Sequence, residues 1–190
     1  VGGIQAIAAL TFGTEIIPKV YKIFGPGNQF VTVAKQVATQ FGVAIDMPAG
    51  PSELMVVADE TAIAAFVASD LLSQAEHGTD SQVILVSTSK DLIDAVETEI
   101  QTQLEVLPRK AIATKAIENS KLIYVENDQI ALDLIDEYGP EHFIICAKNE
   151  DFYVNNIGNA GSVFIGNYTP ESAGDYASGT NHTLPTNGYA

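Results

Sequence analysis

Short apolar runs alternate along this chain with longer segments in which apolar residues recur every three or four positions. The runs are only four or five residues long, which predicts buried strands, and the longer segments predict helices that bury one side. We expect strands at 20–24, 43–46, 54–58, 82–86, 121–125, 143–147 and 162–165. We expect helices at 4–10, 30–41, 61–74, 91–104, 109–119, 129–138 and 151–157.

Near-continuous apolar strands that alternate with helices predict an α/β fold with mostly parallel sheets flanked by helices. The segment 48–52 holds two prolines and a glycine, which interrupt regular structure, so we place a domain boundary there. The prediction is part of one α/β domain over 1–50 and part of a second over 51–190. From Gly166 onward the chain is rich in Gly, Ser, Thr, Asn and Pro, which is typical of a functional loop.

The composition of the chain argues against several classes of function. The 190 residues are 46% hydrophobic and 17% charged, as in a folded globular protein, and the net charge of −15 argues against nucleic-acid binding. No apolar run approaches the roughly 20 residues that span a bilayer. The single cysteine, Cys146, lies in an apolar run, so we expect a small buried side chain and a reducing compartment. The first residues include neither Met nor a basic segment, so we expect the chain to begin within a longer protein.

The pair Glu141–His142 stands just after Gly139–Pro140 and just before an apolar run. Adjacent residues in a strand point to opposite faces, which favours one solvated Glu and one half-buried His. At the entry to a strand this alternation need not apply. Both side chains would then reach one cleft, with His142 accepting a proton and Glu141 activating water.

Gln74 and His77 are three residues apart at the end of a predicted helix, so they face one side of its last turn. An amide oxygen and an imidazole there can bind one metal ion. Gln is an uncommon metal ligand, however, so the spacing alone favours His77 before Gly78 as a cap of the helix. Asp175, in a glycine-flanked loop, would add a carboxylate and make zinc or manganese suitable, with at least one ligand missing. With three histidines in the chain, we read the remaining one, His182, as a turn residue unless its loop closes over the site.

The segment 25–28, Gly-Pro-Gly-Asn, follows a predicted strand and precedes a predicted helix. Such a turn either presents N–H groups to a phosphate or simply reverses the chain, and it lacks the G-x-G-x-x-G pattern. Asp46 is the acidic residue about 20 positions on, and its role stays open. Two glycines before Gln5 leave the same ambiguity between helix packing and room for a ligand.

Five segments together resemble the histidinol dehydrogenase family, in order and from end to end of the chain. They are FGPGN at 24–28, AIDMPAGPSE at 44–53, DLLSQAEHG at 70–78, YGPEH at 138–142 and ESAGDYASGTNH at 171–182. The resemblance implies oxidation of L-histidinol through an aldehyde to L-histidine, the last steps of histidine biosynthesis. It also implies two NAD+, one bound zinc, a cytoplasmic location and incomplete Rossmann-like domains.

The resemblance assigns roles to single positions. Gln74, His77 and Asp175 resemble zinc ligands that also contact the substrate, and Ser52 resembles a further substrate contact. His142 resembles the base that takes the hydroxyl proton, and Glu141 the group that activates water against the aldehyde. Both would touch the substrate. Gln5 and Asn28 resemble the NAD contacts. The resemblance therefore makes 1–50 part of a nucleotide-binding domain and 51–190 part of a domain that carries the metal and catalytic residues.

The family also uses a zinc-binding His and a substrate-binding Glu from the C-terminal region of the other subunit of a homodimer. This chain ends before that region and lacks the N-terminal part of both domains, so we expect little or no activity from it alone. The alternative is a non-catalytic module that binds a dinucleotide or a metal. A zinc hydrolase is a weaker alternative, because Gln is a poor ligand for a catalytic zinc.

Overall fold

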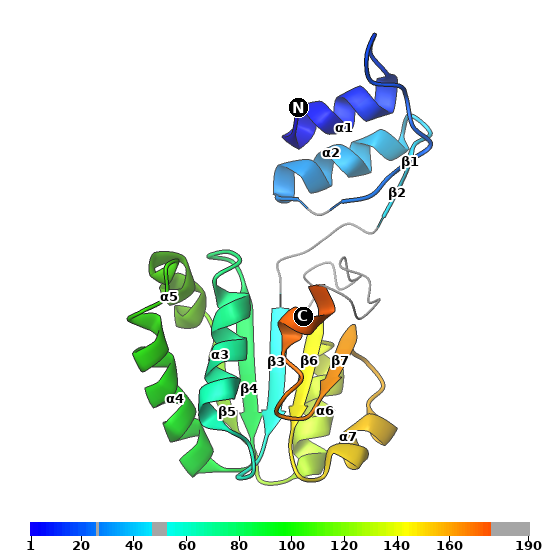
Figure 1. The fold of residues 1–190 in the computed structure, drawn as a ribbon. Helices are drawn as coiled ribbons and strands as arrows, with labels where there is room; N and C mark the ends of the chain where they lie inside the picture. The colour runs from blue at the N-terminus through cyan, green and yellow to red at the C-terminus, as the bar shows by residue number, and fades with distance from the viewer. Residues whose placement is uncertain (26, 47–52, 176–190) are drawn as a thin grey trace. The chain divides into compact units, whose positions relative to one another are not determined.

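The computed structural model describes residues 1–25, 27–46 and 53–175, the side chain of Asp175 excepted. The described chain forms two compact units, and the division between them falls between Gly50 and Pro51 (Figure 1). Each unit is described by itself. The roles assigned above to two domains, nucleotide binding for the first and metal binding with catalysis for the second, stay predictions.

The described residues of the first unit form two helices and two short strands. Helix α1 spans Gly3–Phe12, β1 Lys22–Ile23, α2 Gln29–Thr39 and β2 Ala44–Ile45. The strands pair in parallel, as expected for a strand–helix–strand connection. The ring of Phe12, the last residue of α1, lies 4.8 Å from the ring of Phe41, two residues after the end of α2. The helices therefore run in the same direction, with Gln5 and Asn28 toward their amino ends.

A buried ion pair between Lys35 and Asp46 fastens the turn at Gly25. The Gly25 N–H donates to Asp46 Oδ2 at 2.7 Å, and Lys35 Nζ donates to the Gly25 carbonyl at 2.8 Å. Gly25 has a φ of 150°, a backbone angle that residues with a side chain rarely adopt. Asp46, whose role the sequence left open, thus holds a turn.

The second unit is a five-stranded, all-parallel sheet in the order β5-β4-β3-β6-β7 (Figure 1). This confirms the α/β class with parallel strands and flanking helices. The strands are β3 Glu53–Ala58, β4 Gln82–Ser87, β5 Lys121–Tyr124, β6 His142–Cys146 and β7 Ser162–Ile165. The helices are α3 Ala64–Ala75, α4 Lys90–Leu104, α5 Lys110–Glu118, α6 Asp128–Tyr138 and α7 Glu150–Asn156.

Both faces of this sheet are covered. Alternate residues of β3, such as Leu54 and Val56, pack with α3, α4 and α5, whereas Met55 and Val57 pack with α6 and α7. Every residue of β3 is buried, because the strand lies in the middle of the sheet with a helical layer on each side. This explains why its sequence is an unbroken apolar run after Glu53.

Two details differ from or refine the sequence-based expectations. Part of the expected loop after Gly166 forms a short 3-10 helix, η1 at Glu171–Asp175. Cys146 is buried as expected, and burial above all raises the pKa of its thiol to about 12, which makes it a poor nucleophile. In the parts of the chain that the structure describes, no helix has the length and apolarity to cross a bilayer.

Candidate functional site

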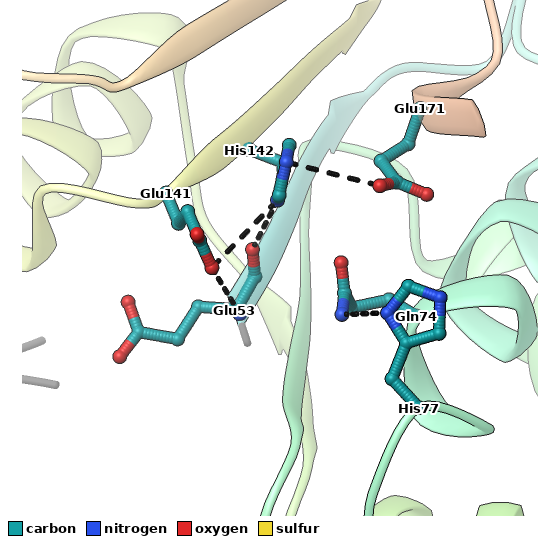
Figure 2. Close-up of polar contacts among 6 residues, drawn as sticks. All are labelled: Glu53, Gln74, His77, Glu141, His142 and Glu171. Atoms are coloured by element: carbon teal, nitrogen blue, oxygen red, sulfur yellow. Dashed lines mark hydrogen bonds and ion pairs between the residues drawn. The ribbon is translucent and has the colours of Figure 1, made fainter. Parts of the chain in front are cut away.

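The candidate site lies at the amino edge of the five-stranded sheet. Glu53 and His142 are the first residues of the neighbouring strands β3 and β6, and His142 is in register with Leu54. Helix α3 runs back across the sheet after β3, so its carboxyl end returns to the same edge. Gln74 and His77 stand at that end (Figure 2).

The backbone of Glu53 holds both members of the Glu141–His142 pair. Its N–H donates to Glu141 Oε2 at 3.2 Å, and its carbonyl oxygen lies 3.2 Å from His142 Nδ1. His142 Nδ1 and Glu141 Oε2 are 3.9 Å apart. Figure 2 shows both side chains directed at the start of β3. The strict alternation of a strand therefore does not separate them, because Glu141 precedes the first paired residue of β6.

The contact with Glu53 also sets the proton position on His142. A carbonyl oxygen only accepts hydrogen bonds, so Nδ1 must carry the hydrogen. In the neutral ring Nε2 then carries no hydrogen and holds the lone pair. The imidazole is mostly buried, with 15% of its side chain exposed. The arrangement makes Nε2 the atom that is able to accept a proton.

The Glu53 side chain is itself buried. Burial first, and the charge of Glu141 second, raise its pKa to about 7. The pKa of Tyr138 is also raised, by burial and then by the charge of Glu53. Tyr138 donates from its hydroxyl to Gln82 Oε1 at 2.6 Å. The amino edge of the sheet thus contains two carboxyl groups whose ionisation is coupled.

Gln74 and His77 lie side by side, with Gln74 Nε2 3.0 Å from His77 Nδ1 (Figure 2). Gln74 is fully buried, and its Oε1 has no hydrogen-bond partner among the residues that the structure describes. A buried amide oxygen without a partner is costly, and a metal ion is one group that satisfies it. Within the described side chains no three His, Cys, Asp or Glu residues cluster as metal ligands. The donors present are compatible with zinc but are not a complete site.

Glu171, the first residue of η1, reaches the same site from the other side of His142. Its Oε1 lies 3.8 Å from His142 Nε2, and its side chain is 2% exposed. The Glu171 N–H donates to the Asp70 carboxylate on α3. Burial raises the pKa of Asp70 to about 6, and this hydrogen bond partly opposes the rise.

The sequence-predicted residues outside this group are Gln5, Asn28, Ser52, Asp175 and His182. Ser52 and His182 lie outside the described residues, and η1 includes the backbone of Asp175. Gln5 and Asn28 belong to the first unit. Asn28 caps α2, its Oδ1 accepting from the N–H groups of Phe30 and Val31 at 3.1 and 3.2 Å.

The whole chain, residues 1–190, matches the family model of histidinol dehydrogenase. The chain belongs to the histidinol dehydrogenase family. A histidinol dehydrogenase from Bacteroides thetaiotaomicron is 61% identical over 189 residues, which cover 100% of this chain and 44% of that protein. The crystal structure of histidinol dehydrogenase from Elizabethkingia anophelis matches with a TM-score of 0.94 and 58% identity, covering 100% of this chain and 44% of that one.

The family resemblance expected from the five segments is therefore confirmed, and the chain spans less than half the length of these relatives. A propionaldehyde dehydrogenase from Rhodopseudomonas palustris shares the fold alone, with a TM-score of 0.57 and 18% identity over 96% of this chain and 55% of that one.

Sequence reasoning did not single out Glu53, Glu171 or Asp70. An acidic residue that opens a fully apolar strand is a signal for Glu53, because a carboxyl group there must be buried. Asp70 sits one helical turn before Gln74 on α3, so it faces the same side of that helix. Glu171 gave no signal, since its approach to His142 joins segments 29 positions apart.

Proposed function

We propose that the full-length protein, of the length of its relatives and containing residues 1–190, oxidises L-histidinol through L-histidinaldehyde to L-histidine. The reaction would use two NAD+ and one bound zinc. The observation that carries the proposal is the grouping of Glu141, His142, Gln74 and His77 at one sheet edge in a chain of this family (Figure 2). This grouping offers a base, an acid and two metal donors.

His142 is the proposed base of both oxidation steps. Its Nδ1–H is held by the Glu53 carbonyl, which leaves Nε2 to take the proton of the substrate hydroxyl. The C–H bond of the same carbon gives up a hydride, for which NAD+ is the acceptor when bound. The products of the first step are the aldehyde, NADH and a proton on His142.

Glu141 is the proposed activator of water between the two oxidations. Its Oε2 accepts a hydrogen bond from the Glu53 N–H, which fixes the carboxylate beside His142. Removal of a proton from water lets its oxygen add to the aldehyde carbon, while the proton held by His142 passes to the aldehyde oxygen, so that a hydrated aldehyde forms and His142 is again able to accept a proton. A second deprotonation by His142 and a second hydride loss give the carboxylic acid.

Gln74 and His77, with Asp175, are the proposed zinc ligands of this chain. These residues would hold the zinc, which would supply a binding point for the nitrogen groups of the substrate and so help to orient its hydroxyl carbon toward the base. These residues suit zinc because the buried Gln74 oxygen and the adjacent His77 ring are both metal donors. Ser52, just before β3, is the proposed further substrate contact.

The first unit is the proposed NAD-binding part, through Gln5 and Asn28. Both lie toward the amino ends of helices that run in the same direction, where backbone N–H groups favour the negative charge of a pyrophosphate. Asn28 uses its oxygen to cap α2, so its amide nitrogen is the group available to the cofactor.

We further propose that the full-length protein is a cytoplasmic homodimer, in which a partner subunit completes the zinc and substrate sites. The 190-residue chain alone would then turn over poorly or not at all. The decisive experiment mixes the full-length protein with L-histidinol and NAD+ and follows absorbance at 340 nm. A rise of two NADH for each histidine supports the proposal. Zinc or NAD binding without any rise favours the non-catalytic alternative.

A further inference from the structure

His142 contacts a different residue through each ring nitrogen. Nδ1 is occupied by the Glu53 carbonyl at 3.2 Å, whereas Nε2 faces Glu171 Oε1 at 3.8 Å (Figure 2). The second distance exceeds that of a direct hydrogen bond but lies within the range of an ion pair. The Nε2 lone pair is therefore not consumed by Glu171, yet a positive charge formed on the ring would lie beside its carboxylate.

Glu171 is held in this position by its own surroundings. Its side chain is 2% exposed, and its N–H donates to Asp70, a residue of α3. Helix α3 also packs against η1, so the two segments are joined at more than one point. A buried carboxylate fixed in this way interacts with a nearby charge more strongly than one in water, because the surroundings screen it less.

We propose that Glu171 is a positioning residue for the reaction, one that stabilises the imidazolium of His142 after Nε2 has taken the substrate proton. The inference rests on the proposed function, in which His142 is the base. Glu171 does not touch the substrate in this proposal. It acts through His142, in the way that a buried acid supports a general base from beside the ring.

Other charged groups also face His142. Glu141 approaches Nδ1 at 3.9 Å, and Glu53 presents its carbonyl there, with a carboxyl group coupled to Glu141. From β7 the ring of Phe164 lies 6.3 Å away and carries no charge. Glu171 differs from these groups because it lies beside Nε2, the nitrogen that gains the proton.

The kinetic test replaces Glu171 by Gln in the full-length protein. We expect kcat to fall about 10- to 100-fold while KM changes less than about threefold, because the ground state of the substrate is not contacted. The acid limb of the kcat profile should move down by about one pH unit, since the imidazolium loses a nearby negative charge. Glu118→Gln, at an exposed position on α5, is the matched control and should leave kcat, KM and the pH profile unchanged.

A second test needs no turnover and uses the 190-residue chain. The chain contains only three histidines, so imidazole resonances can be assigned by the loss of one signal in His142→Asn. Glu171→Gln should lower the titration midpoint of His142 by about one pH unit. Glu171→Asp keeps the negative charge at a greater distance from His142, so it should lower the titration midpoint less than Glu171→Gln does. If Glu171→Gln does not fold, the titration of the Glu171→Asp chain is the test.

The experiments distinguish a failure of the proposed function from a failure of the proposed role of Glu171. If the unsubstituted full-length protein does not oxidise histidinol, the proposed function fails, whatever the imidazole resonances show. If it does, and Glu171→Gln keeps its kcat, KM and pH profile, the role of Glu171 is overturned alone. An unmoved His142 titration in a folded Glu171→Gln or Glu171→Asp chain overturns it as well.

Discussion

The Glu53 carboxyl is buried beside the Glu141 carboxylate, and its pKa rises to about 7 from an ordinary value of 4.5. Below pH 4.5 the group is protonated in the folded and the unfolded chain alike, so its stabilising contribution is present in full. Between pH 4.5 and 7 the unfolded chain releases the proton and the folded chain retains it. Stability is therefore lost as pH rises through this window.

Glu53→Gln should remove this part of the pH dependence. We expect urea unfolding of the substituted chain to show a shallower fall in unfolding free energy between pH 4.5 and 7, with a residual slope from Asp70, whose pKa is about 6. Glu118→Gln, at an exposed position, should retain the original slope. If the unfolding free energy of Glu53→Gln fell as steeply with pH as that of the unsubstituted chain, the raised pKa of Glu53 would be contradicted.

His142→Asn removes the proposed base and keeps a hydrogen-bond donor near the Glu53 carbonyl. In the full-length protein kcat should fall about 10²- to 10⁴-fold while substrate binding changes little, because the loss is confined to proton transfer. Steady-state kinetics with histidinol and a direct binding titration measure the two effects. A near-normal rate would remove His142 from the mechanism.

Glu141→Gln should separate the two halves of the reaction. The amide oxygen still accepts from the Glu53 N–H, so the local structure is retained, but the side chain no longer takes a proton from water. We expect oxidation of histidinaldehyde to be impaired more than oxidation of histidinol. Rates measured with each compound as the starting substrate test this, and equal losses would count against the division of labour.

Zinc affinity tests the ligand assignment. Gln74, His77 and Asp175 provide one imidazole and one carboxylate as strong donors, fewer than a tight site needs. The 190-residue chain should bind zinc more weakly than the full-length protein, by several kcal/mol out of the roughly 10–16 kcal/mol typical of structural zinc. Calorimetric titration of both after chelation measures the difference. Equal affinity would mean that another group of this chain, such as His182, closes the site.

The Lys35–Asp46 ion pair should matter for the first unit. Its side chains are 5% and 11% exposed, so Lys35→Met leaves a carboxylate buried without its counter-charge and should cost about 3–5 kcal/mol. Hydrogen exchange of amides in 27–46 reports this locally. The exposed pair Lys110–Glu105 supplies the control, because Lys110→Met should cost less than about 1 kcal/mol. If Lys35→Met and Lys110→Met cost the same stability, the buried ion pair would contribute no more than the exposed one.

The sequence by itself determined the order of elements and the fold class. Strands such as β3 are apolar over their whole length because helices cover both faces of the sheet, and this burial is visible in the residues alone. The sequence also identified the family, since five segments of residues suited to one chemistry occur in a fixed order. These properties depend on local composition and on spacing along the chain.

Only the tertiary structure decided which residues meet. The Glu53 backbone joins the Glu141–His142 pair across 88 and 89 positions, and Asp46 reaches the Gly25 turn across 21. Glu171 approaches His142 only because η1 follows β7 back to the amino edge of the sheet. A hydrogen bond or an ion pair depends on distances of a few ångströms, and strand register and helix direction set these distances between segments remote in sequence.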